Sequence, residues 1–212
     1  MIDKFCLFLT KKIQKEMPDV DKERAEIINY GLQLIIGEIP KMFITIAVAY
    51  LLGTFKLTLF MILSLLAFRA FSGGFHLKTH IGCIVSTTLY YCCIPKISIY
   101  FLLHNPMKGI FILCVWIFGV IMIKLYAPAD TENAPILRKK ERKQKKLLSY
   151  ITFTVGLIVA MIIEDNTIAN ILILGNLIQS IMITPVAYKL TNNKYGYQVH
   201  RKEGDAYVEN IS

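Results

Sequence analysis

The chain has 212 residues, of which 55% are hydrophobic, and it carries a formal net charge of +9. This hydrophobic share and the positive mean hydropathy of +0.51 exclude an ordinary soluble domain and predict an integral membrane protein. The charge does not indicate nucleic-acid binding, because most lysine and arginine residues stand beside apolar runs, where they set membrane topology.

The first segment, residues 1–29, is interrupted repeatedly by charged residues, so we do not expect a cleavable signal peptide. Its apolar residues recur near a helical period between Ile2 and Ile13, and lysines occupy other positions. This pattern predicts an amphipathic helix that lies at a membrane surface.

Six apolar segments follow, and they predict an all-α polytopic membrane protein that forms a single domain over residues 1–212. They cover approximately residues 30–55, 57–68, 81–103, 109–126, 147–163 and 168–186. The second has only 12 residues, which as a helix would cover about 18 Å of a hydrocarbon layer about 30 Å thick. We therefore expect this short helix to end within the membrane and to leave the polar residues after it in a recessed, protein-lined pocket.

Lysine and arginine residues predict the orientation of these segments. Six fall within residues 1–29, seven within residues 138–146, and four after Val186. Because cation-rich loops stay inside, the N-terminal segment, the loop 127–146 and the tail 187–212 are all expected in the cytoplasm. An even number of crossings satisfies this arrangement, and the same parity places residues 69–80 on the cytoplasmic side.

The first apolar segment contains three residues that are unusual inside a membrane, Glu38, Pro40 and Lys41. An ionisable side chain at that depth is expected to face a polar cavity or a partner. Two interpretations remain open: Glu38 and Lys41 pair with each other three positions apart on one helix face, or they have a functional role.

The five cysteines form an odd set without the spacing of a disulfide framework. They are Cys6, Cys83, Cys92, Cys93 and Cys114. Cys83 has histidines close by in sequence, His76 and His80, and a thiol beside a base is the minimum for nucleophilic catalysis by cysteine. Cys83 is therefore the candidate nucleophile, whereas Cys92, Cys93 and Cys114 are expected to be small packing residues.

Helix geometry favours His80 as the base, because it is three positions from Cys83 and the two would be neighbours on a helix. His76 is seven positions away, about 10 Å along a helix axis. It can reach Cys83 only if the chain leaves the helix and folds back, which the glycine pair at positions 73–74 permits.

Two cations, Arg69 and Lys78, flank this stretch. Either could bind a carboxylate of a peptide substrate or stabilise an oxyanion, and either could equally extend to the membrane interface at a helix end. A metal site formed by His76, His80 and Cys83 would have no carboxylate nearby, so we expect neither a metal nor a cofactor.

Two blocks of residues along the chain form a recognisable pattern. The first has the order Arg69, Gly74, His76 and Cys83, and the second is "LYAPADTENAPI", residues 125–136, before the basic run. Together they resemble the AgrB family (accessory gene regulator protein B). Weaker matches are Pro185 in "ITPVAYKL", and Gln33 and Glu38 in "GLQLIIGEIPK", so that the resemblance covers about residues 20–190.

The resemblance implies a membrane-embedded cysteine endopeptidase of Gram-positive bacteria that matures a quorum-sensing peptide. Its catalytic residues fall on Cys83 and His76, so it favours His76 over His80 as the base. The implied partner is an AgrD-like precursor peptide, cleaved through an acyl-thioester and closed into a thiolactone ring, and a homodimer is also implied. The supporting or substrate-binding positions are Arg69, Gly74, Lys78, Gln33, Glu38 and Pro185.

Two alternatives come from other functional classes. A small peptide exporter or permease would use the interruption at residues 38–41 as a broken-helix substrate site, but it needs no reactive thiol. A membrane scaffold for a signalling complex would tolerate the loss of Cys83.

Overall fold

The computed structural model describes residues 2–17, 20–75, 77, 79–101, 107–132 and 135–201. Within these ranges the regular elements are all helices, which confirms the predicted all-α class. The helices are α1 (Ile2–Glu16), α2 (Lys22–Leu51), α3 (Phe55–Ser72), α4 (His80–Tyr100), α5 (Met107–Tyr126), α6 (Lys139–Ile162), α7 (Asn166–Met182) and α8 (Pro185–Leu190).

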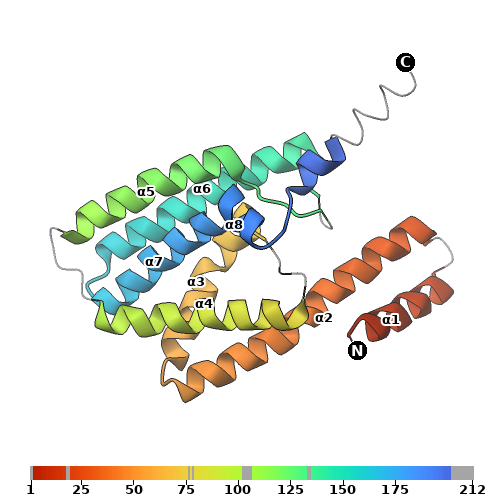
Figure 1. Cartoon of the computed structure of the whole chain (residues 1–212), viewed down its shortest axis with the longest axis horizontal. Helices are drawn as coiled ribbons and strands as arrows, with labels where there is room; N and C mark the ends of the chain where they lie inside the picture. The colour runs from red at the N-terminus through yellow and green to blue at the C-terminus, as the bar shows by residue number, and fades with distance from the viewer. Residues whose placement is uncertain are drawn as a thin grey trace.

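Helices α2 to α7 form a bundle in which α4 to α7 lie roughly side by side and α3 crosses them at a steep angle (Figure 1). Among the described residues, five helices, α2 to α6, are long and apolar enough to cross a membrane, and α7 is a shorter apolar helix of 17 residues. Large apolar side chains cover the outside of the bundle, among them Leu63, Ile110 and Met161, each more than half exposed. The chain is therefore a multi-pass membrane protein with about six apolar helices, as predicted.

Helix α3 is longer than the sequence predicts, which corrects the expected 12-residue span at residues 57–68. It runs from Phe55 to Ser72 and has 18 residues, so it covers about 27 Å. The helix continues past the apolar run, and Arg69 in its last turn has a polar partner on α7, because its Nη1 donates to Gln179 Oε1 at 3.2 Å. The polar stretch after α3 is thus not recessed by a short helix.

Helix α2 is continuous over 30 residues and contains Pro40 in its interior. It begins at Lys22, where Asp21 serves as the N-cap and accepts a hydrogen bond from the Arg24 N–H at 2.8 Å. The interruption seen in the sequence therefore does not break the helix. At about 45 Å, α2 is longer than a hydrocarbon layer is thick, so its first turns extend beyond the bundle.

Helix α1 packs against this extended part of α2, and the two form an N-terminal hairpin (Figure 1). Cys6 and Thr10 of α1 are buried, and Thr10 Oγ1 donates to Asn29 Oδ1 of α2 at 3.3 Å. Phe5 and Phe8 stay exposed on other sides of α1. The predicted helix is present, and its contact with a membrane surface stays a prediction.

The largest buried cluster is built where α3, α5 and α6 meet around the ring of Phe153. Gly119 of α5 faces this ring so closely that an added Cβ would overlap it. On its other side the ring contacts Phe68 of α3, with the ring centroids 5.2 Å apart. A small residue thus lets two apolar helices approach, as is common where membrane helices pack.

The start of α6 and the end of α7 differ from the predicted boundaries. The expected loop 127–146 ends earlier, because residues 139–146 already belong to α6. The last apolar segment also ends earlier, at Met182, and Pro185 is the first residue of α8 after the N-cap Thr184. Proline suits this position because the first turn of a helix does not use its N–H.

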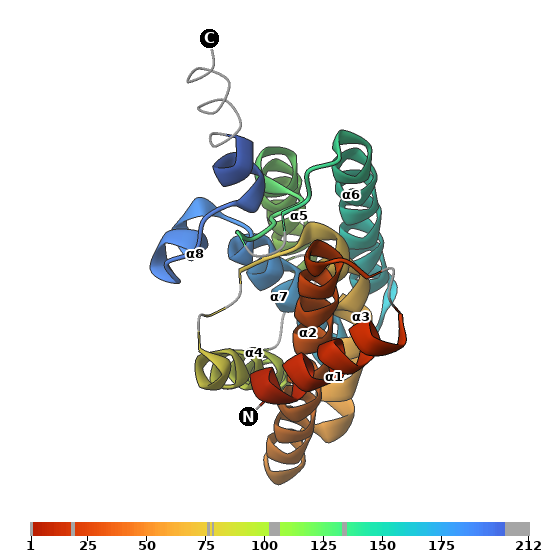
Figure 2. The same cartoon turned by 90° about the vertical axis from the view of Figure 1, so that its right-hand side faces the viewer.

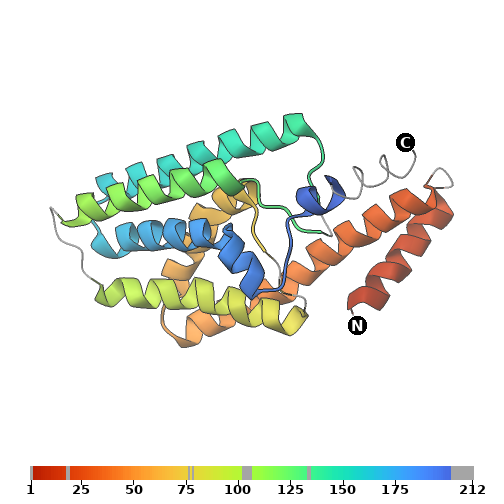
Figure 3. The same ribbon diagram turned by 45° about the horizontal axis from the view of Figure 1, so that its top comes forward.

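The helices alternate in direction, so their connections gather at two ends of the bundle (Figure 3). At one end, Lys108 Nζ of α5 donates to the Ile163 carbonyl after α6 at 2.9 Å. At the other end lie the N-terminal hairpin, the start of α4 and α8, which Figure 2 shows together. The described parts of the segments predicted to be cytoplasmic share this second end, and the membrane face that it occupies stays a prediction.

Candidate functional site

The predicted nucleophile, Cys83, lies in the first turn of α4 at this second end. The helix begins at His80, and Thr79 is its N-cap, whose side chain accepts from the Gly82 N–H at 3.1 Å. Cys83 is half-buried, and its N–H donates to the Thr79 carbonyl at 3.0 Å. The start of a helix carries a partial positive charge, which favours an anion on the sulfur.

A lysine of α2 reaches the sulfur of Cys83. Lys41 Nζ lies 3.9 Å from Cys83 Sγ, and the Lys41 residue is only 8% exposed. The same ammonium forms an ion pair with Glu38 Oε1, so the pairing, one of the two interpretations left open by the sequence, is present in the structure. The contact with Cys83 was not predicted, because the two residues are 42 positions apart and no spacing rule joins them.

The two candidate bases, His76 and His80, stand just before α4 and at its first residue in the sequence. His76 and Lys78 lie outside the described residues, and of His80 the structure describes the backbone as the first residue of α4. The described residues between Ser72 and His80, which are 73–75, 77 and 79, are not helical. The assignment of the base to His76 remains a prediction from resemblance.

The glycine pair after α3 is held against the residues that follow α5. The Gly74 N–H donates to the Ala129 carbonyl at 2.9 Å, and the Ala129 N–H donates to the Ser72 carbonyl at 2.8 Å. Gly73 has φ +75° and Gly74 φ +149°, conformations that side chains with a Cβ rarely adopt. The first and second sequence blocks are therefore in direct contact.

Gln179 of α7 joins the glycine pair to Arg69. Its Nε2 donates to the Gly73 carbonyl at 2.8 Å and to Ser72 Oγ at 3.0 Å, while its Oε1 accepts from Arg69 Nη1 at 3.2 Å. Gln179 is fully buried. Arg69 therefore points into the bundle toward α7, and it contributes to holding the loop. Gln179 was not among the predicted site residues, although a polar amide in an apolar helix is a signal for such a role.

Asp130 is the centre of a buried polar network behind this loop. Its Oδ2 accepts from Arg142 Nη1 at 3.1 Å and from the N–H groups of Ile136 and Tyr197, each at 2.9 Å. The Arg142 guanidinium also lies over the Tyr197 ring, 4.3 Å from its centroid. At least one cation of the basic run thus has a structural role in addition to any effect on topology.

Tyr188 of α8 closes this network from the other side. Its hydroxyl donates to the carbonyls of Ala129 at 2.9 Å and Asp130 at 3.1 Å. Burial, followed by the neighbouring Tyr195 and Asp130, raises the pKa of Tyr188 far above its ordinary value, so the hydroxyl stays a donor. The loop that carries the glycine pair is therefore anchored through Ala129 to α8.

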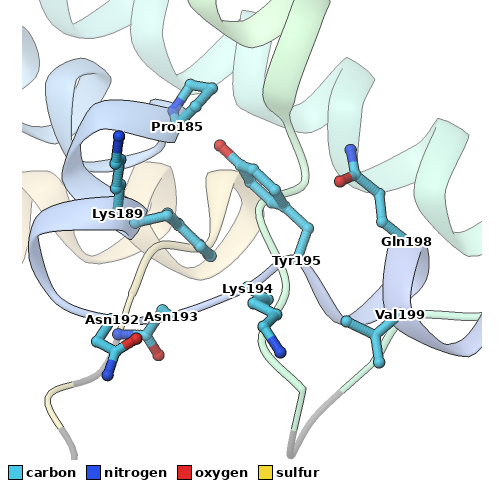
Figure 4. Close-up of a pocket in the computed structure, with 9 residues that line it drawn as sticks. Pro185, Lys189, Asn192, Asn193, Lys194, Tyr195, Gln198 and Val199 are labelled. Carbon is cyan, nitrogen blue, oxygen red and sulfur yellow. The ribbon is translucent and has the colours of Figure 1, made fainter.

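The remaining predicted positions are spread over two elements. Gln33 is half-buried on α2, about 12 Å along the axis from Lys41, so the structure brings Lys41 and not Gln33 to Cys83. Pro185 lines a cavity of about 590 Å³ between α8 and the C-terminal segment, which also contributes Tyr195 and Gln198 (Figure 4). Neither Cys83 nor Lys41 lines this cavity.

Gly73→Ala is expected to destabilise the protein by about 2 kcal/mol. The reason is twofold: the backbone at Gly73 strains any residue with a Cβ, and the added Cβ would overlap the Ala129 carbonyl oxygen. Thermal unfolding in detergent measures the change.

The matched control for this prediction is Gly53→Ala. Gly53 has a similar φ of +69°, but an added Cβ has no neighbour within 4 Å, so only backbone strain remains. The loss of stability should then be smaller, about 1 kcal/mol. Equal destabilisation of the two variants would contradict a specific role for the contact with Ala129.

Comparisons with known proteins find relatives along most of the chain. The family described as accessory gene regulator B matches residues 7–183. Accessory gene regulator protein B of Staphylococcus aureus (strain JH9) is 31% identical over 187 residues, which are 88% of this chain and 94% of that relative. An AgrB-like protein of Listeria innocua serovar 6a is 28% identical over 184 residues, 86% of this chain and 88% of that relative. No solved structure matches the chain.

Proposed function

The chain belongs to the accessory gene regulator B family, and we propose that it is a membrane-embedded cysteine endopeptidase that acts on a short precursor peptide. Family membership links it to the accessory gene regulator quorum-sensing system. The proposed substrate is an AgrD-like precursor, cleaved toward its C-terminal end. The observation that carries the proposal is the thiol of Cys83 at the start of α4, with the Lys41 ammonium 3.9 Å from its sulfur.

The proposed reaction begins when the proton of the Cys83 thiol passes to His76. The thiolate then attacks a peptide carbonyl carbon, His76 gives its proton to the leaving amine, and the C–N bond breaks. The N-terminal part of the precursor remains on Cys83 as an acyl-thioester. This step needs no metal or cofactor, because thiol and imidazole supply the nucleophile and the proton transfer.

The proposed second step is transfer of the acyl group to a cysteine inside the precursor. Its thiolate attacks the thioester carbon, the bond to Cys83 Sγ breaks, and a thiolactone ring closes. One thioester replaces another, so the exchange is nearly isoenergetic. A site that excludes water would therefore favour ring closure over hydrolysis.

The end of the bundle that carries Cys83 is proposed to face the cytoplasm, where the precursor is made. The excess of lysine and arginine in residues 1–29 and 138–146 supports this orientation. Both termini would then lie on the cytoplasmic side. A homodimer is proposed from the family resemblance alone.

The proposal is tested by incubating the protein in liposomes with the synthetic precursor and analysing both by mass spectrometry. A wild-type sample is expected to yield cleaved peptide and an acyl adduct on the peptide that contains Cys83. Cys83→Ala should give neither product. Cys93→Ala is the matched control, because it removes an exposed thiol from the same helix, and it should retain both products.

Two other outcomes would overturn the proposal. Transfer of intact precursor across the bilayer, without an adduct, would identify a peptide exporter. Unchanged processing by Cys83→Ala would exclude Cys83 as the nucleophile.

A further inference from the structure

Helices α2 and α4 run in parallel, and polar contacts fix their register. Thr45 Oγ1 of α2 lies 3.1 Å from Thr88 Oγ1 of α4, and Cys92 Sγ donates to the Thr45 carbonyl at 3.6 Å. The contact between Lys41 and Cys83 lies about one turn nearer the start of α4. The contact between Lys41 and Cys83 is therefore one of several contacts along the interface between α2 and α4.

The burial of Lys41 is not explained by membrane topology. A lysine that marks a membrane interface extends its ammonium to water or lipid headgroups, whereas Lys41 is only 8% exposed. Burying an ammonium is unfavourable unless partners surround it. The structure provides such partners on two sides, the carboxylate of Glu38 and the sulfur of Cys83.

Helices α2, α3 and α7 pack against α4, and they carry few ionisable side chains among the described residues. Helix α7 has no ionisable side chain, and Arg69 of α3 is bonded to Gln179. The other titratable side chains that the structure describes on α2, α3 and α4 are Arg24, Glu26, Glu38, Tyr50, Lys56, Tyr90, Tyr91, Cys92, Cys93, Lys96 and Tyr100. Lys41 Nζ, on α2, is in contact with Cys83 Sγ.

We propose that Lys41 is a further catalytic residue, whose fixed positive charge stabilises the negative charge that develops on the Cys83 sulfur during the reaction. This inference deepens the proposed peptidase function and rests on it. Lys41 remains an ammonium throughout: the proton of the Cys83 thiol goes to His76, the sulfur electron pair forms the bond to the acyl carbon, and the leaving amine takes the proton from His76. Glu38 orients the ammonium through its ion pair and is a positioning residue.

The test measures the rate at which iodoacetamide alkylates Cys83 in the full chain in liposomes, by peptide mass mapping. For Lys41→Met, alkylation at about pH 7 is expected to fall about tenfold, since the ammonium in contact with the sulfur stabilises the anion that reacts with iodoacetamide. At about pH 10, above the ordinary pKa of a thiol, the variant and the wild type should react equally fast. Lys41→Arg keeps the charge and should stay within about threefold of the wild type.

Lys96→Met is the matched control, because it removes a lysine from the far part of α4, where Nζ donates to the Leu52 carbonyl. It should leave Cys83 alkylation unchanged. Lys41→Gln, with the same expected loss, serves if the methionine variant loses its fold in thermal unfolding. Alkylation of Lys41→Met or Lys41→Gln at the wild-type rate at about pH 7 would overturn the proposal.

Precursor cleavage is measured on the same samples, so that the two proposals can be separated. Cleavage should fall together with alkylation in Lys41→Met. If wild-type protein cleaves no precursor while alkylation still depends on Lys41, the peptidase function fails and the electrostatic assignment stands. If cleavage occurs but Lys41→Met reacts like the wild type in both assays, the role of Lys41 fails alone.

Discussion

His76→Ala is expected to abolish precursor cleavage, whereas His80→Ala keeps most of it. A general base that forms the nucleophile and then protonates the leaving group contributes about 10²–10⁴-fold to the rate, so its removal should bring cleavage to the detection limit. The family resemblance places this role on His76. The measurement is single-turnover cleavage of the precursor by each variant in liposomes.

The comparison of the two histidines is its own control. Both substitutions remove a histidine from the same short stretch of sequence, and His80 is the first residue of α4. Local spacing alone favours His80, which is three positions from Cys83. Loss of cleavage in His80→Ala together with normal cleavage in His76→Ala would reverse the assignment.

Asp130→Ala is expected to destabilise the protein by about 3 kcal/mol, since removing one partner of a buried ion pair leaves the other without compensation. The Asp130 side chain is fully buried, and its Oδ2 accepts three hydrogen bonds, from Arg142 and from the N–H groups of Ile136 and Tyr197. The Arg142 side chain is 22% exposed, so water recovers part of the loss on that side. Unfolding by heat and by denaturant in detergent measures the change.

Processing should fall with stability in Asp130→Ala, because Ala129, the next residue, carries the hydrogen bonds that hold Ser72 and Gly74. Glu132→Ala is the matched control, two positions further on. Its ion pair with Lys194 spans 3.5 Å between exposed side chains and is worth about 0–1 kcal/mol. Equal effects of the two substitutions would show that the network around Asp130 is not what stabilises this end of the bundle.

Helix α3 extends beyond the span that the hydropathy of neighbouring residues predicts. Hydropathy alone ended the segment at Phe68, before Arg69, but the helix continues to Ser72. The side chain of Arg69 is bonded to Gln179, which is 110 positions away in sequence. A window of neighbouring residues contains no information about such a partner, so the end of the helix was placed too early.

The basic run illustrates the same limit for function. Its seven cations predict topology through their number, which is a property of composition. The role of Arg142 in binding Asp130 depends on where α6 begins relative to the residues after α5, and composition does not specify this. The resemblance of residues 125–136 to a known family marked the segment as important without explaining why. The explanation is its contact with the glycine pair.

The sequence alone predicted four features of this protein. These are its place in a membrane, the number of its apolar helices, the amphipathic N-terminal helix and Cys83 as the candidate nucleophile. They depend on hydrophobicity, charge and residue spacing within about 20 positions, and these quantities act locally. The sequence did not predict that Lys41 lies beside Cys83. Lys41 lies 42 positions before it, on a helix that passes alongside α4, and its approach depends on how two long helices pack. Side chains brought together by packing acquire their charge environment from the fold, so the lysine beside the thiol became visible only in three dimensions.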